Sequence, residues 1–297
     1  MAISLSQMLT LFGGACVAGL FGSLLGVGGG MFIVPLIVLG FHFPMKTAVA
    51  ASIVSVIATS NAGGSSYVDQ RIANLKLAMF LEVFTTLGAM IGAVLAMHLQ
   101  EWLMLLLFSL LMAYLAYGSF TTRHLDDRKI RANQFADAAH TGVARFLDLS
   151  GSYYDKSAGQ DVPYVVTGGG IGSSLSFVAG ITSGMLGVGG GVVKVSAMNR
   201  FMNVPMKVAV GTSKLMIGIT AAVSSAVFFA SGLIEFALVA PVALGTTVGA
   251  TVGTLIMNRL PSSLLKWIFS ILVIYIGYSM LARALFLRLG VSLPHAG

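Results

Sequence analysis

The 297-residue sequence has few charged residues, a single cysteine and no Lys or Arg before Lys46. Charged side chains make up 9% of the chain, against 57% hydrophobic residues. So few polar side chains cannot cover the surface of a water-soluble fold, and we expect an all-α polytopic membrane protein. Because the apolar runs are continuous rather than alternating, a transmembrane β-barrel is excluded.

Other absences limit the chemistry. Cys16 alone cannot form a disulfide framework, and we expect no metal or iron–sulfur site. The first residues lack the positive charge of a cleavable signal peptide, so none is expected. Gly-x-Ser-x-Gly, His-Glu-x-x-His and Walker A motifs are missing, and the five histidines fall at segment ends or in polar stretches. We therefore expect no catalytic residue, no cofactor and no nucleic-acid partner.

Among the residues that are present, glycine forms two clusters inside apolar stretches, at 25–30 and 186–191. A shift of 161 positions superimposes them without a gap. The same shift places Pro44-Met45-Lys46 on Pro205-Met206-Lys207. The sequence thus predicts two homologous membrane repeats, 1–120 and 164–297, joined by a polar linker, 121–163.

Each repeat is predicted to hold five membrane segments, estimated from its apolar runs. In the first repeat they cover about 5–25, 31–43, 47–68, 76–98 and 102–120, and in the second about 165–186, 192–203, 207–232, 236–257 and 264–287. The second segment of each repeat is too short to cross a hydrocarbon core of about 30 Å. We interpret the first two segments as half-helices that meet at the glycines inside the membrane, so that each repeat contains a broken helix.

Basic residues predict that the two repeats have opposite orientations. In the first repeat Arg71 and Lys76 lie between segments three and four, whereas in the second Arg259 and Lys266 lie between segments four and five. By the positive-inside rule these loops share one side, so the five-plus-five repeat is inverted. The linker becomes cytoplasmic and both termini external.

The linker and the charge balance add two expectations. Apolar residues at helical spacing over 130–147 predict an amphipathic helix, and residues 156–160 are predicted to be the turn of a short hairpin. The net charge of +7 is concentrated in residues 164–297, where eight Lys or Arg residues face Glu235 alone. This excess suggests an anionic partner, either membrane lipids or a solute. A homodimer is possible.

The glycine clusters are the first candidate site. An unwound junction leaves amide N–H groups free, and such groups at a helix N-terminus bind anions. The alternative, close helix packing, fits Gly88, Gly92 and the glycines of 245–253 better than it fits the clusters. The predicted anion site therefore includes Gly28, Gly29, Gly30, Gly189, Gly190 and Gly191.

Charged and hydroxyl side chains complete the predicted site. Lys194 and Lys214 stand where the first repeat has isoleucine, and charges inside a membrane are costly and usually functional. Glu82 stands where the second repeat has alanine, and it either neutralises a lysine or carries a coupling proton. The hydroxyls beside the clusters either bond between helices or line the site: Ser52, Ser55, Thr59, Thr212, Ser213, Thr220 and Ser224.

Each Gly-x-Gly-Gly-Gly cluster is followed by Pro-Met-Lys and an Ala-Val-x-x-Ser run. With this doubled pattern the chain resembles the TauE/SafE family of sulfite and organosulfonate transporters over nearly everything outside 121–163. Pro35 follows the first cluster, as the family often shows. The equivalent position after the second cluster is Ser196, which departs from this pattern. The resemblance implies a secondary carrier for a small sulfur-containing anion in the cytoplasmic membrane of a prokaryote. We expect alternating access coupled to an ion gradient, with an uncoupled anion channel or an intramembrane enzyme as alternatives.

Overall fold

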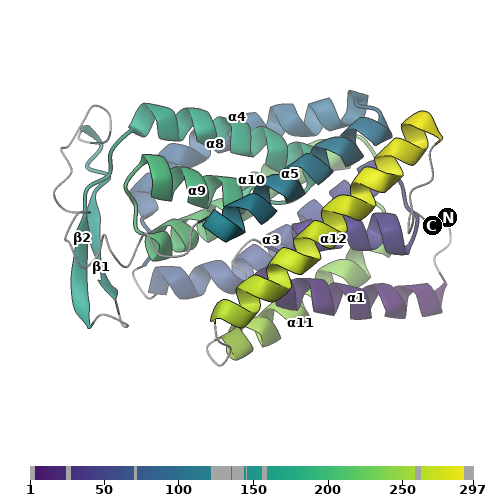
Figure 1. Cartoon of the computed structure of the whole chain (residues 1–297), viewed down its shortest axis with the longest axis horizontal. Helices are drawn as coiled ribbons and strands as arrows, with labels where there is room; N and C mark the ends of the chain where they lie inside the picture. Colours follow the sequence, from purple (N-terminus) through teal and green to yellow (C-terminus); the bar gives the residue numbers. More distant parts are fainter. Residues whose placement is uncertain are drawn as a thin grey trace.

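The structure is a computed structural model of the chain. It describes residues 4–24, 28–69, 72–121, 135, 144, 146–155, 159–257 and 262–290. Within it the helices lie roughly along one long axis, and a small β-hairpin lies at one end (Figure 1). The first helix begins, and the last described helix ends, at the opposite end (Figure 1).

A helix occupies each predicted apolar segment. The first-half helices are α1 (Leu5–Leu24), α2 (Gly30–Pro35), η1 (Leu36–Gly40), α3 (Met45–Asp69), α4 (Leu75–His98) and α5 (Glu101–Thr121). Those of the second half are α8 (Gly169–Leu186), α9 (Gly191–Phe201), α10 (Met206–Ala230), α11 (Phe236–Met257) and α12 (Ser262–Leu289). Five of the described helices are long and apolar enough to cross a membrane. The all-α, multi-pass membrane class is confirmed.

The second segment of the first half folds back along α1. A Cβ on Gly14 would touch the Leu36 side chain, and a Cβ on Gly22 would overlap the backbone of Gly29. The short arm, Gly30–Gly40, covers only about 16 Å at 1.5 Å per residue. The structure therefore differs from a pair of half-helices: α1 is a full-length helix, and only the returning arm is short.

The second half contains an equivalent hairpin of α8 and α9. A Cβ on Gly172 would overlap the Met202 side chain, and a Cβ on Gly190 would lie 2.8 Å from the Ala179 carbonyl oxygen. Since Gly172 lies near the start of α8 while Met202 follows the end of α9, the two arms are antiparallel. Both short helices thus return toward the end of the bundle at which their long arm began.

Glycine allows the long arm of each hairpin to pack closely on a helix of the other half. From Gly88 to Gly92, α4 faces the carbonyl groups of Phe177 and Ile181 on α8, and the two helices lie side by side in Figure 1. In the same way Gly245 and Gly249 on α11 meet successive turns of α1. The prediction that these glycines permit close packing is confirmed. In both pairs the sequence advances in the same direction along the two helices.

Between the halves, β1 (Gly151–Asp155) and β2 (Gln160–Tyr164) form an antiparallel pair, which confirms the predicted hairpin. The Asn74 side chain donates hydrogen bonds to the Leu149 carbonyl (2.7 Å) and to the Tyr164 hydroxyl (2.9 Å). Burial raises the pKa of Tyr164 above its ordinary value. These contacts fasten the hairpin to the loop before α4. Most of the amphipathic helix predicted over 130–147 lies outside the described residues.

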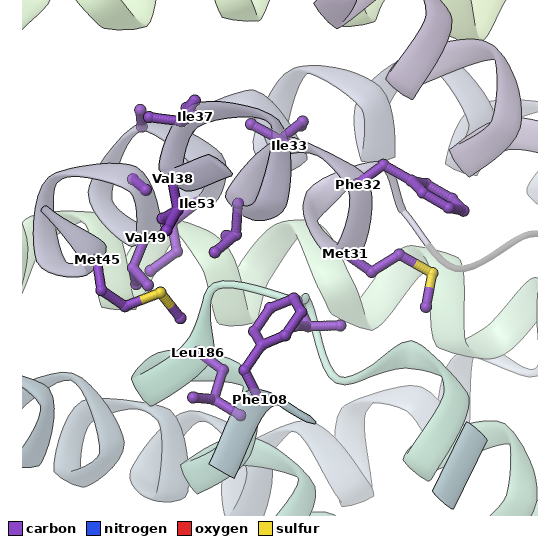
Figure 2. Packing of buried hydrophobic residues seen from close by; sticks show 14 of the residues in the cluster. Met31, Phe32, Ile33, Ile37, Val38, Met45, Val49, Ile53, Phe108 and Leu186 are labelled. Atoms are coloured by element: carbon purple, nitrogen blue, oxygen red, sulfur yellow. The ribbon is translucent and has the colours of Figure 1, made fainter. Parts of the chain in front are cut away.

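The returning arm of the first hairpin lies in an apolar core. Met31, Ile33 and Ile37 have no exposed surface, and they pack with residues of α3 and with Phe108 and Leu186 (Figure 2). Because this arm carries only apolar side chains after its glycines, it needs no polar partner. Its counterpart α9 carries a lysine, and that lysine leads to the candidate site.

Candidate functional site

The tips of the two hairpins meet inside the bundle. A Cβ on Gly30, the first residue of α2, would overlap the carbonyl oxygen of Gly187 at the second tip. The hydroxyl of Ser52, which is fully buried on α3, donates to the Gly187 carbonyl (2.8 Å) and to the Gly30 carbonyl (3.3 Å). Ser52 therefore joins both tips, and the contact requires glycine at position 30.

The second tip has the same serine contact. Ser213 on α10 donates to the carbonyl of Gly191 at 3.2 Å. Positions 213 and 191 are the equivalents of Ser52 and Gly30 after the shift of 161 residues. The two repeats thus use one device to hold the first turn of the returning helix against the long helix that follows it.

The glycines between the arms have the unwound backbone that the sequence predicts. Gly28 before α2, and Gly187, Gly189 and Gly190 before α9, have positive φ angles of 73°, 70°, 81° and 63°. Side chains rarely adopt this conformation, so glycine is favoured there. At this end of α9 the Lys194 amide donates to the Gly190 carbonyl (3.1 Å). The preceding amides, from Gly191 onward, are those that a helix leaves without an intrahelical acceptor.

Lys194 lies in the first turn of α9, just beyond these amides, and its side chain has no exposed surface. Its ammonium group donates to the Thr220 hydroxyl on α10 (2.8 Å). The nearest carboxylate oxygen is Oε2 of Glu82 on α4, at 3.7 Å. Three helices therefore contribute to one buried cluster of charge, and the cluster joins the two halves.

Glu82 is held mainly through one of its two carboxylate oxygens. Oε1 accepts hydrogen bonds from Thr220 (2.7 Å) and from Thr86 (3.2 Å). Oε2 is buried and has no hydrogen-bond partner among the described residues. The side chain as a whole is 8% exposed. We call Glu82, Lys194 and Thr220 the charged cluster.

Two of the predicted hydroxyls bond within their own helix instead. The Ser55 hydroxyl donates to the Ala51 carbonyl (2.9 Å), and the Thr59 hydroxyl donates to the Val56 carbonyl (3.1 Å). Such local bonds are the ordinary way for a hydroxyl in an apolar helix to be satisfied. In the described part of the chain, no hydrogen bond joins either residue to the charged cluster.

Thr212 and Lys214 also lie apart from the cluster contacts. The Thr212 hydroxyl accepts the backbone N–H of Asn74 (3.0 Å), and it therefore fastens the loop before α4. Lys214 is buried, with 7% exposure, and its carbonyl accepts the Ser60 hydroxyl (2.6 Å). Six residues separate Lys214 from Thr220, which is about 120° around an α-helix. Lys214 and Thr220, the partner of Lys194, consequently lie on different sides of α10.

Sequence reasoning missed the central place of Thr220. It grouped Thr220 with Ser213 and Ser224 as one hydroxyl face, and seven residues, about two turns, do place Ser213 and Thr220 on one side of α10. The partner Thr86 stands four residues after Glu82, a spacing that places both side chains on one face of a helix.

The cluster has the chemistry of an anion-binding site. It offers an ammonium group, a hydroxyl and a nearby helix N-terminus, all of which favour negative charge. Among the described residues no three His, Cys, Asp or Glu side chains gather as metal ligands. Such donor groups are suited to an oxyanion, and a carboxylate such as that of Glu82 is a group that can exchange a proton.

Comparison with known proteins gives a consistent result. The family model described as sulfite exporter TauE/SafE matches residues 11–280. The chain is 26% identical to "Probable membrane transporter protein YunE" of Bacillus subtilis, over 91% of this chain and 96% of that protein. It is 24% identical to a "Probable membrane transporter protein" of Xylella fastidiosa (strain 9a5c), over 95% and 98% of the two chains. No solved structure matches the chain.

Proposed function

The chain belongs to the sulfite exporter TauE/SafE family of membrane transporters, and from this premise we propose that it carries a small sulfur-containing anion by alternating access. The anion is sulfite or an organosulfonate, and an ion gradient drives the movement. The observation that carries the proposal is the meeting of the two glycine tips beside a buried lysine. Backbone amides and Lys194 together form a site suited to an oxyanion.

The directions of the helices support an inverted repeat. The first returning arm is antiparallel to α1, and the short loops after it reverse the chain at α3 and again at α4, so α4 runs opposite to α1. Because α8 runs with α4, it runs opposite to α1, its equivalent in the first repeat. By the same argument α11 runs with α1 and opposite to α4. Inverted repeats that meet at a central site are a recurring architecture of alternating-access carriers.

We assign the direct contact with the anion to Lys194 and the second-tip amides. Gly189, Gly190 and Gly191 lead into the helix that carries Lys194, so one segment supplies both amides and charge. Lys214 is buried on another side of α10, and we assign it no direct contact with the anion. In the first repeat the equivalent arm is apolar, and there Gly28, Gly29 and Gly30 serve to position the tips against each other.

The cellular setting follows from charge and relatives. Lys76 forms a salt bridge with Asp148, just before the hairpin. Arg200 and Lys207 flank the loop between α9 and α10, where Asn203 donates to the Val165 carbonyl just after the hairpin. Positive charge collects on the cytoplasmic side of membrane proteins. The relatives named above come from bacteria. We infer a location in the cytoplasmic membrane of a prokaryote, with membrane lipids around the exposed apolar helix faces.

Counterflow in proteoliposomes tests the proposal. Vesicles preloaded with unlabelled sulfite or methanesulfonate, and diluted into the labelled anion, should transiently accumulate label above its external concentration. A carrier must reorient with each anion, whereas an anion channel lets label equilibrate without overshoot. Protein-free vesicles give the background. Entry of label without overshoot, and without response to an imposed pH gradient, would favour the channel instead.

A further inference from the structure

The charged cluster is balanced but incompletely bonded. The ammonium of Lys194 has three N–H donors, and the described residues provide it with one hydrogen-bond acceptor, Thr220. Glu82 Oε2 faces it at 3.7 Å without a hydrogen bond. An ammonium with spare donors beside an unsatisfied carboxylate oxygen is an arrangement that can take up both an anion and a proton.

Charge counting limits what can enter. Lys194 and Glu82 sum to zero, so a bound monovalent anion would leave the cluster with a net negative charge. Electrostatic repulsion between the anion and Glu82 is strong where water is scarce, and a proton on Glu82 removes it. The protonated carboxyl gains an O–H donor, which can point from Oε2 toward the anion.

We propose that ionised Glu82 is the counter-anion of Lys194 in the empty carrier. The substrate anion takes its place beside Lys194 only when Glu82 takes up one proton from solution. This inference rests on the proposed function and specifies its coupling ion. The proton binds Glu82 Oε2 as the anion binds Lys194, and both leave together on the other side. The carrier thus moves one proton with each anion.

Among the described residues, Lys194 is the one charged side chain that contacts Glu82. Helix α8, packed along α4, has no ionisable residue over 169–186. Helix α10 carries Lys207 and Lys214, and α4 itself carries Lys76 and His98 near its ends. Of these, none has a described contact with Glu82, whose partners are Lys194, Thr220 and Thr86.

The test counts protons taken up per anion bound. Purified protein is titrated with methanesulfonate and with sulfite in buffers of different ionisation enthalpy, and the same titrations are run on Glu82→Gln. Because both proteins receive the same anion, the difference between them cancels the protonation of the anion itself. Glu101→Gln is the matched control, since Glu101 accepts the Met45 amide (3.1 Å), far from the cluster, and a glutamine oxygen can do the same.

We expect wild type and Glu101→Gln to take up one proton more per anion than Glu82→Gln. The affinity of wild type should also fall about tenfold per unit rise in pH relative to Glu82→Gln, as one linked proton requires. Equal proton counts in two proteins that both bind anion would overturn the inference and leave the proposed function standing. If the wild-type protein binds neither anion, the proposed function itself is contradicted, and the inference that rests on it falls with it.

A second measurement keeps the inference testable if Glu82→Gln does not fold. Infrared difference spectra of wild type, with and without anion, should show a new band of a protonated carboxyl group on anion binding. The Glu101→Gln protein should show the same band. Anion binding without such a band would contradict the proposal.

Discussion

The two repeats differ most at one set of equivalent positions. In the second hairpin Lys194 contacts Thr220 and approaches Glu82. The positions related by 161 residues are Ile33, Thr59 and Ala243. In each set one residue lies on the returning arm, one on the long helix that follows it and one on a helix of the other half. Only one of the two sets is charged.

The uncharged set shows what the scaffold requires. Ile33 has no exposed surface and packs in the apolar core (Figure 2), and Thr59 bonds to its own helix. The serine contacts at the tips occur in both halves. Shared positions therefore hold the hairpins in place, whereas the charged cluster is an addition made to one of them. Such an addition is costly in stability, and charges inside a membrane are usually retained for function.

The largest expected effect comes from removing one charge of the cluster. Lys194→Met should lower the free energy of unfolding by about 3–5 kcal/mol, because it leaves Glu82 as an uncompensated buried carboxylate. Ile33→Met introduces the same residue, methionine, at the equivalent position, and it should lower the free energy of unfolding by less than about 1.5 kcal/mol. Unfolding in mixed detergent micelles measures both. Similar losses in the two variants would mean that the repeats do not differ in the way described.

A smaller difference is expected at the two threonines. Thr220→Val should cost about 1.5–3 kcal/mol, since it removes hydrogen bonds to two charged groups. Thr59→Val removes only a local bond and should cost less than about 1 kcal/mol. The same unfolding assay compares them. Equal costs would show that Thr220 acts, like Thr59, only within its helix.

The glycines of the long helices should show no difference between the halves. Gly88→Ala and Gly249→Ala each drive a methyl group into a carbonyl of the facing helix, and each should cost about 1–3 kcal/mol. Gly13→Ala is the control, because nothing lies within 4 Å of its added Cβ; it should be neutral or stabilising by up to about 1 kcal/mol. Very different costs at 88 and 249 would argue against a shared scaffold.

Much of the fold could be predicted because membrane helices follow continuous apolar runs. The segment predicted at 236–257 is α11, Phe236–Met257. The internal shift of 161 residues located both hairpins, and small residues identified the close helix contacts. These features are local or repeated, so one sequence is enough to show them.

The site was less predictable because its contacts join distant segments. The sequence offered Glu82 as a partner for some lysine but gave no way to choose Lys194 over Lys214. The sequence also predicted Thr212 as a site residue. In the structure the Thr212 hydroxyl accepts the backbone N–H of Asn74, in the loop before α4. The reversal of the chain at Gly28 was also hidden, since glycines permit a turn without specifying its direction.

Anion binding by a variant that copies the first repeat tests the central claim most directly. Lys194→Ile combined with Glu82→Ala installs the residues found at 33 and 243, and it removes both charges together, so the protein should fold. We predict that calorimetric affinity for sulfite or methanesulfonate falls by about ten- to a hundredfold, the value of a lost charge-assisted hydrogen bond. Lys46→Met, whose lysine donates to the Met97 carbonyl at the far end of α4, should change it by less than about tenfold. Wild-type affinity in the double variant would contradict the account.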